Sequence, residues 1–140
     1  MEDSGKLVES LTHIYREYDL ISRRYDEFIH HIIDSFNDDH MGVVNNIQYR
    51  NTEDDGLELK FCGNEIKISY SFEPDNENKG RILLYKKVGE DFVLFDSFGY
   101  NEKAETDIQT DSVSTLYWLN EHAHAINIML HYLKRSFNTD

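Results

Sequence analysis

Seven histidines are the residues of this chain best able to bind a metal, and two groups of them lie close in sequence. His30 and His31 are neighbours, and His122 and His124 lie two residues apart. If both segments are helical, residues one or two apart point in different directions, so neither group can chelate one ion. His124 and His131 would share a helix face, but two turns separate them. Zinc patterns such as HExxH are absent, and we predict no metal site.

The only cysteine and the paired carboxylates give no firmer signal for chemistry. Cys62 stands beside a predicted turn, without a glycine-rich nucleophile elbow or a histidine that the sequence orients toward it. The pairs Asp38-Asp39 and Asp54-Asp55 leave room for a loose cation site, but residues 75–80 do not follow the EF-hand order. Seven scattered glycines form no phosphate-binding loop. We therefore predict a protein that is not an enzyme and needs no cofactor.

The composition is typical of one soluble domain spanning residues 1–140. Hydrophobic residues make up 39% of the 140 positions and aromatic residues 13%, which is too many for a disordered chain. A single cysteine excludes an internal disulfide and fits a reducing compartment. The N-terminal residues lack the pattern of a signal peptide, and no apolar run approaches the length of a membrane span. We expect a cytoplasmic protein.

Two long helices are predicted at the two ends of the chain. Apolar residues in 6–36 recur at steps of three and four, which is the spacing of one helix face, and Ser4 can cap the start. Residues 112–137 show the same spacing, with Asp111 or Ser112 as the cap and two basic residues near the end. The first stripe consists of Leu7, Leu11, Ile14, Tyr18, Ile21, Tyr25, Phe28 and Ile32.

Alternating apolar residues between the helices predict strands. Residues 57–62 and 66–72 alternate around Gly63-Asn64 and form one hairpin with a single apolar face. Residues 81–87 and 92–98 form a second pair with two apolar faces, which favours a central position or cover on both sides. Further strands are predicted at 43–50 and, as a short sixth strand, at 104–109.

This order predicts an α+β fold. A long N-terminal helix precedes an antiparallel meander of four to six strands and a long C-terminal helix, with the helices on one face of the sheet. A helix over 6–36 would rise roughly 46 Å, whereas a six-residue strand spans about 20 Å. The first helix must therefore overhang the sheet, break near residues 22–24, or pair beyond the sheet edge. Its apolar stripe offers a route to a homodimer through the N-terminal helix.

Negative charge is concentrated between the elements. The formal net charge is −13, and three stretches carry most of it: 51–56, 73–80 and 99–111. In a meander, successive connections alternate between the two ends of the sheet, so all three stretches should meet at one end. Such concentrated charge would attract a basic partner. The predicted partner-binding residues are Glu53, Asp54, Asp55, Glu73, Asp75, Glu77, Tyr100 and Glu102, with Tyr100 either an aromatic anchor or part of the core.

The charge sign decides between partners. Nucleic acids and anionic lipids would be repelled, so we expect a basic protein as the partner, such as a toxin, a nuclease or a nucleic-acid-binding enzyme. In size, acidity and the lack of a catalytic signature, the chain resembles bacterial toxin-immunity proteins. We therefore predict an immunity protein or inhibitor that acts through its acidic loops. The alternatives are an acidic secretion-type chaperone acting as a dimer, or a nucleic-acid-mimicking phage inhibitor.

Overall fold

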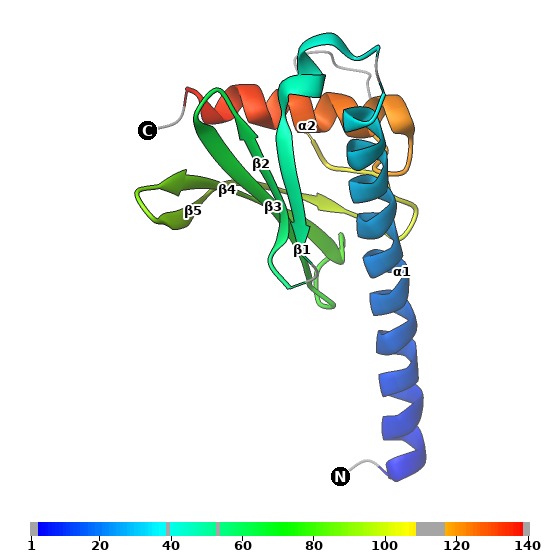
Figure 1. Cartoon of the computed structure of the whole chain (residues 1–140). Helices are drawn as coiled ribbons and strands as arrows, with labels where there is room; N and C mark the ends of the chain where they lie inside the picture. Colours follow the sequence, from blue (N-terminus) through cyan, green and yellow to red (C-terminus); the bar gives the residue numbers. More distant parts are fainter. Residues whose placement is uncertain (1–2, 39, 53, 109–116, 139–140) are drawn as a thin grey trace.

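A computed structural model describes residues 3–38, 40–52, 54–108 and 117–138. The order of elements is α1 (Ser4–Phe36), the 3₁₀ helix η1 (Gly42–Asn46), β1 (Gln48–Thr52), β2 (Gly56–Phe61), β3 (Asn64–Phe72), β4 (Gly80–Val88), β5 (Asp91–Tyr100) and α2 (His122–Ser136). The strands form one antiparallel sheet in the order β1-β2-β3-β4-β5 (Figure 1). The predicted α+β meander between two helices is therefore confirmed, with five strands.

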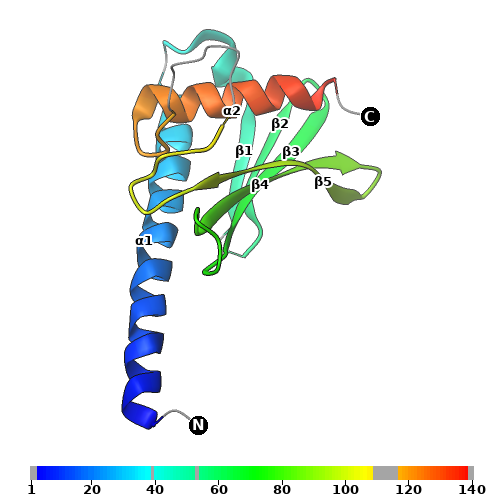
Figure 2. The same cartoon turned by 180° about the vertical axis from the view of Figure 1, so that it is seen from behind.

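Helix α1 is continuous and extends well beyond the sheet. Asp3, rather than the predicted Ser4, caps it, because the Asp3 carboxylate accepts a 2.9 Å hydrogen bond from the Lys6 backbone N–H. Both views show the N-terminal half projecting past the strands, while the C-terminal half runs beside the sheet and reaches α2 (Figures 1 and 2). Of the three arrangements that helix length allowed, the overhang is the one observed.

The first hairpin turns one residue earlier than predicted. Phe61 pairs with Asn64, so Cys62 and Gly63 are the two turn residues, and their φ angles are 52° and 82°. Two left-handed residues in a row are what a tight type I′ turn requires, and Asn64 is therefore free to begin β3. The first strand also differs from the prediction of 43–50, because residues 42–46 form η1 and pairing begins only at Gln48.

The second hairpin lies at the edge of the sheet, so the prediction of a central or doubly covered pair is wrong. β5 is the last strand, and the side chains of Val88, Val93 and Leu94 are 50–55% exposed. A bulge at Phe95 shifts the register between Leu84 and Tyr85, which explains why the sequence shows two apolar faces there. The predicted sixth strand at 104–109 is reduced, over the residues described, to single bridges at positions 105 and 106.

Helix α2 begins ten residues later than predicted. Leu119 is fully buried outside the helix, and its backbone N–H donates to the Ala104 carbonyl at 2.9 Å. The backbone of residues 117–119 is hydrogen-bonded to the chain after β5, so these residues cannot be part of the helix. Glu121 then caps the helix, because its carboxylate accepts a 2.9 Å bond from the His124 N–H. The predicted caps Asp111 and Ser112 lie outside the described residues.

The core lies between one face of the sheet, α2 and the C-terminal half of α1. Tyr132 of α2 stacks on Phe98 of β5 with ring centroids 5.6 Å apart, and Tyr25 of α1 stacks on Tyr70 of β3 at 4.4 Å. Most of the N-terminal half of α1 projects past the strands, so the prediction of both helices on one face does not hold for the whole of α1 (Figure 1). Neither α1 nor α2 has an apolar run sufficient to cross a bilayer. The fully buried aliphatic side chains of the sheet are Leu57, Leu59, Ile66, Ile68, Ile82 and Leu84.

Candidate partner-binding site

The meander brings two of the three acidic connections together at one end of the sheet, as predicted, and the third lies apart from them. The β1–β2 and β3–β4 loops lie side by side at the lower end of the sheet, and the two-residue turns lie at the other end (Figures 1 and 2). The chain that follows β5 leaves at the corresponding end, but the sheet is twisted, so that β5 runs at a steep angle to β1 (Figure 1). Its last residues therefore lie higher, beside α1 (Figure 1).

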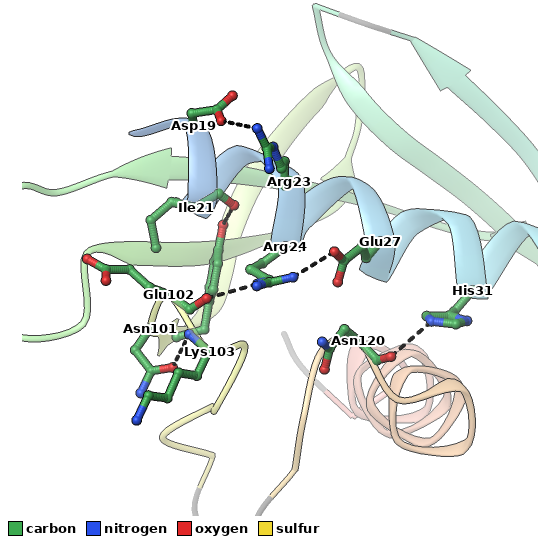
Figure 3. Close-up of polar contacts among 11 residues, drawn as sticks. Asp19, Ile21, Arg23, Arg24, Glu27, His31, Asn101, Glu102, Lys103 and Asn120 are labelled. Atoms are coloured by element: carbon green, nitrogen blue, oxygen red, sulfur yellow. Dashed lines mark hydrogen bonds and ion pairs between the residues drawn. The ribbon is translucent and has the colours of Figure 1, made fainter. Parts of the chain in front are cut away.

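Helix α1 anchors this third segment. Arg24 donates from Nε to the Glu102 carbonyl at 2.8 Å and from Nη1 to the Glu27 carboxylate at 2.7 Å, as Figure 3 shows. The Asn101 side-chain oxygen accepts a 3.0 Å bond from the Lys103 backbone N–H, which closes the loop on itself. Because a charged side chain spans helix and loop, the backbone of the loop at Glu102 is held in place relative to α1.

One shallow hollow joins the second and third acidic segments. It has a volume of about 320 Å³ and is lined by Glu77, Lys79, Asn101, Glu102, Lys103 and Glu105. The Lys79 ammonium is already engaged, since it lies 2.9 Å from the Pro74 carbonyl and 3.5 Å from the Glu17 carboxylate. Three glutamates, Glu77, Glu102 and Glu105, thus line the hollow together with two lysines. One of these lysines, Lys79, already has partners within its own chain.

A larger cleft of about 550 Å³ lies between α1 and the β1–β2 loop, and we call it the α1–β2 cleft. Asp26 lines it from the helix and Asp54 from the loop, while Tyr25 and Tyr70 provide aromatic walls. Partial burial raises the pKa of Asp26, so the charged form of this carboxylate is disfavoured where it sits. A cationic side chain entering the cleft would relieve that cost. Sequence reasoning missed Asp26, because a polar residue next to a helical stripe looks like an ordinary surface position.

Three of the acidic-stretch residues instead support the fold. The Glu73 carboxylate forms a 2.8 Å ion pair with Arg81, and the Asp107 carboxylate accepts a 2.7 Å bond from the Gly99 N–H. Tyr100 is fully buried, and its hydroxyl donates to the Ile21 carbonyl at 2.8 Å. Its ring occupies the space that a Cβ at Gly80 would need, so it cannot be a surface anchor. Tyr100 therefore closes the core, the second of its two predicted roles.

The remaining predicted residues define the candidate site. Asp54, Asp55, Asp75 and Glu77 are exposed and Glu102 is half-buried, and we call these five residues the acidic end. None of the five forms an ion pair within 4.0 Å in the described part of the chain. Glu53, also predicted, lies outside the described residues. The acidic end thus carries five carboxylates without a close ion-pair partner among the described residues.

No family model, curated protein or solved structure matches this chain significantly. Among the predicted carboxylates, Glu73 stabilises the fold, whereas others, such as Asp54 and Glu77, face solvent. The sequence pattern alone does not distinguish these two kinds of residue. The signal that would have exposed the first group is pairing across strands, since Glu73 and Arg81 flank the two ends of one β3–β4 connection.

Proposed function

We propose that this chain is a small acidic protein-binding module, an immunity protein or inhibitor that neutralises a basic toxin or nuclease through its acidic end. The observation that carries the proposal is the set of five carboxylates without a cationic partner among the described residues, collected at one end of the sheet. Like charges held together repel one another and disfavour the compact state, so a function that uses them explains their retention. A basic protein would relieve the repulsion on binding and would be steered toward this end.

The α1–β2 cleft and the smaller hollow would bind cationic side chains of such a partner. A lysine or arginine side chain fits the chemistry of the α1–β2 cleft, where Asp26 and Asp54 supply negative charge and Tyr25 and Tyr70 supply ring faces. A second cation could meet Glu77 and Glu102 in the smaller hollow. Occupying the basic surface that a nuclease uses to hold its substrate would block the enzyme without any chemistry by the inhibitor.

A dimeric secretion-type chaperone is the second candidate, and one specific observation favours it. The N-terminal half of α1 presents exposed apolar side chains, which would supply a dimer contact. The nucleic-acid mimic has less support. Mimicry of a nucleic acid needs carboxylates spread along an extended surface, whereas here they gather at one end of the sheet.

A pull-down compares the acidic end with the opposite end of the sheet. The bait is the full chain, either unaltered, with Asp54→Asn and Asp55→Asn, or with the control pair Glu90→Gln and Asp91→Asn in the exposed β4–β5 turn. Both double variants remove two negative charges. We expect the unaltered chain to retain a basic protein that elutes as salt rises. The Asp54/Asp55 variant should associate with it about tenfold more slowly, because steering is lost, while the control should bind nearly as the unaltered chain does.

Two results would contradict the proposal. The first is capture only of partners whose retention does not change with salt. The second is an equal loss of binding in both double variants, since that would mean that total charge, and not its position, governs association. Thermal unfolding of all three baits serves as the check on folding. Because Asp54 and Asp55 are exposed and repel each other, we expect midpoints that are unchanged or slightly higher.

A further inference from the structure

Residues 4–18 of α1 expose an apolar stripe, and among the described residues it is contacted by the sheet only at its end, where Tyr18 meets Phe72. These residues are the free half of α1, and residues 19–36 are the packed half. The stripe continues without a break into Ile21, Phe28 and Ile32, which are at most 1% exposed. In the free half the exposed fractions are 46% for Leu7, 61% for Val8, 64% for Leu11, 39% for Ile14, 66% for Tyr15 and 42% for Tyr18.

We propose that the free half of α1 pairs with the free half of a second copy of this chain, in antiparallel orientation, to form a homodimer. This inference does not depend on the proposed function, since it uses a different surface. The contact would place the stripes of the two helices face to face over about 22 Å, the length of fifteen helical residues. The heptad-like spacing of Leu7, Leu11, Ile14 and Tyr18 is the spacing that such a pair uses.

Charge favours a second copy at this position. Two chains of net charge −13 repel each other in general, but the free half is neutral, with Lys6 and Arg16 against Glu9 and Glu17. Glu17 is also engaged within its own chain, at 2.6 Å from the His13 ring and 3.5 Å from Lys79. A copy can therefore approach along the free half without bringing carboxylates together.

The available area is close to what a modest dimer needs. The six exposed side chains present on the order of 600 Å² per copy, against roughly 800 Å² per partner in a standard interface. This places the contact at the low end of specific interfaces, where dissociation is measurable at micromolar concentrations. An interface of this kind is apolar, so its strength should not fall as salt rises.

The position of the sheet determines the orientation. The same stripe holds the sheet from the last residue of the free half onward, as the Tyr18–Phe72 ring contact at 5.5 Å and the Tyr25–Tyr70 stacking of the packed half show. A parallel partner helix would bring a second sheet into the space that the first one fills. An antiparallel partner places its sheet beyond the opposite end of the contact, beside the N-terminus of the first helix, where both views show open space (Figures 1 and 2).

Antiparallel pairing also gives a self-complementary register. Leu7 would lie against the partner subunit's Tyr18, and Leu11 against the partner subunit's Ile14, so that four layers are related by one two-fold axis. Val8 and Tyr15 border the stripe on the same side, and each would meet the other across the axis. A small side chain thus faces a large one in the outer layers and at Val8–Tyr15, while two aliphatic side chains of equal size meet in the central layers.

Sedimentation equilibrium of the full chain, from about 1 µM to about 200 µM, tests the dimer. We expect a reversible monomer–dimer equilibrium that is unchanged or strengthened at high salt. Leu11→Asp should raise the dissociation constant at least about a hundredfold, because it places charges in the centre of the contact. Leu94→Asp, at a 50% exposed site on β5, is the matched control and should leave the equilibrium unchanged. A monomer at every concentration, or equal effects of both variants, would overturn the proposal.

A distance measurement tests the orientation. In a Cys62→Asn background, which keeps a residue tolerant of the left-handed turn position, a spin label is attached at Ser4→Cys. Antiparallel pairing in the stated register separates the two labelled positions by about 26 Å along the helices. Parallel pairing would bring them to about 10 Å, and that result would overturn the antiparallel contact. The Leu11→Asp variant should still capture the basic partner, so failure of the dimer and failure of the acidic end are distinguishable.

Discussion

The two halves of α1 carry the same sequence pattern and have different surroundings. In the packed half, Phe28 is 1% exposed and Ile32 is fully buried. In the free half, Leu11 is 64% exposed at an equivalent place in the repeat. An apolar stripe determines which face of a helix is available for burial. The length of the sheet determines how much of that face the described part of the chain can bury. The remainder is available to another molecule.

The largest expected difference between the halves is in stability. Phe28→Ala should lower the free energy of unfolding by about 3–5 kcal/mol, because it removes a buried ring and leaves a cavity. Leu11→Ala should change it by less than about 0.5 kcal/mol, because the side chain has little to contact in the monomer. Urea denaturation at submicromolar concentration, where the chain is monomeric, measures both. Similar losses for the two variants would mean that the free half contributes to the core.

A smaller difference in stability is expected between substitutions of two neighbouring arginines, which lie on different sides of the packed half. Arg24 bonds to the Glu102 carbonyl and to Glu27, whereas Arg23 forms a 2.6 Å ion pair with Asp19 one helical turn away, on the solvent side (Figure 3). Arg24→Ala should cost about 1.5 kcal/mol, and Arg23→Ala less than about 0.5 kcal/mol. Thermal unfolding of the two variants side by side measures this, and a larger loss for Arg23→Ala would contradict the anchoring role of Arg24.

The smallest effect concerns Asp26, on the side of the packed half that lines the α1–β2 cleft. Partial burial raises its pKa above the ordinary value of 3.8, so the unfolded chain loses this proton at a lower pH than the folded chain does. Stability should therefore fall as pH rises through the interval between the two pKa values. Asp26→Asn should be slightly more stable than the unaltered chain at pH 7 and no longer so below pH 3.8. Urea midpoints between pH 3 and pH 7 measure the difference, and the opposite trend would refute it.

Much of the fold follows from periodicity in the sequence. The step of three and four predicts both helices, and strand alternation predicts the meander and thereby the shared end of the acidic loops. The errors arise where a local pattern competes with a tertiary contact. Leu119 continues the apolar spacing of α2 toward the N-terminus, yet its backbone N–H is bonded to the Ala104 carbonyl outside any helix. The helix therefore starts only at His122. Phe95 makes β5 look apolar on both faces because a bulge shifts the register.

The candidate site is less predictable than the fold, for a physical reason. Whether a carboxylate faces solvent or serves the fold depends on which side chains lie across the sheet from it. Glu73 and Glu77 lie in the same acidic stretch and look alike in the sequence, but the Arg81 guanidinium lies 2.8 Å from the carboxylate of Glu73. Tyr100 appears in an acidic segment, but the last residue of β5 points into the core opposite Gly80. Topology predicts where segments meet, and side-chain pairing then selects among their residues.

Hydrogen exchange followed by mass spectrometry at two protein concentrations tests most directly whether the stripe has two roles. An isolated helical extension of fifteen residues frays readily, so amides 4–18 should exchange rapidly at about 1 µM. At about 200 µM, the second copy should slow their exchange severalfold, in high salt as well as in low salt, while amides 19–36 stay equally protected at both concentrations. Exchange of the free half that does not depend on concentration would contradict the account.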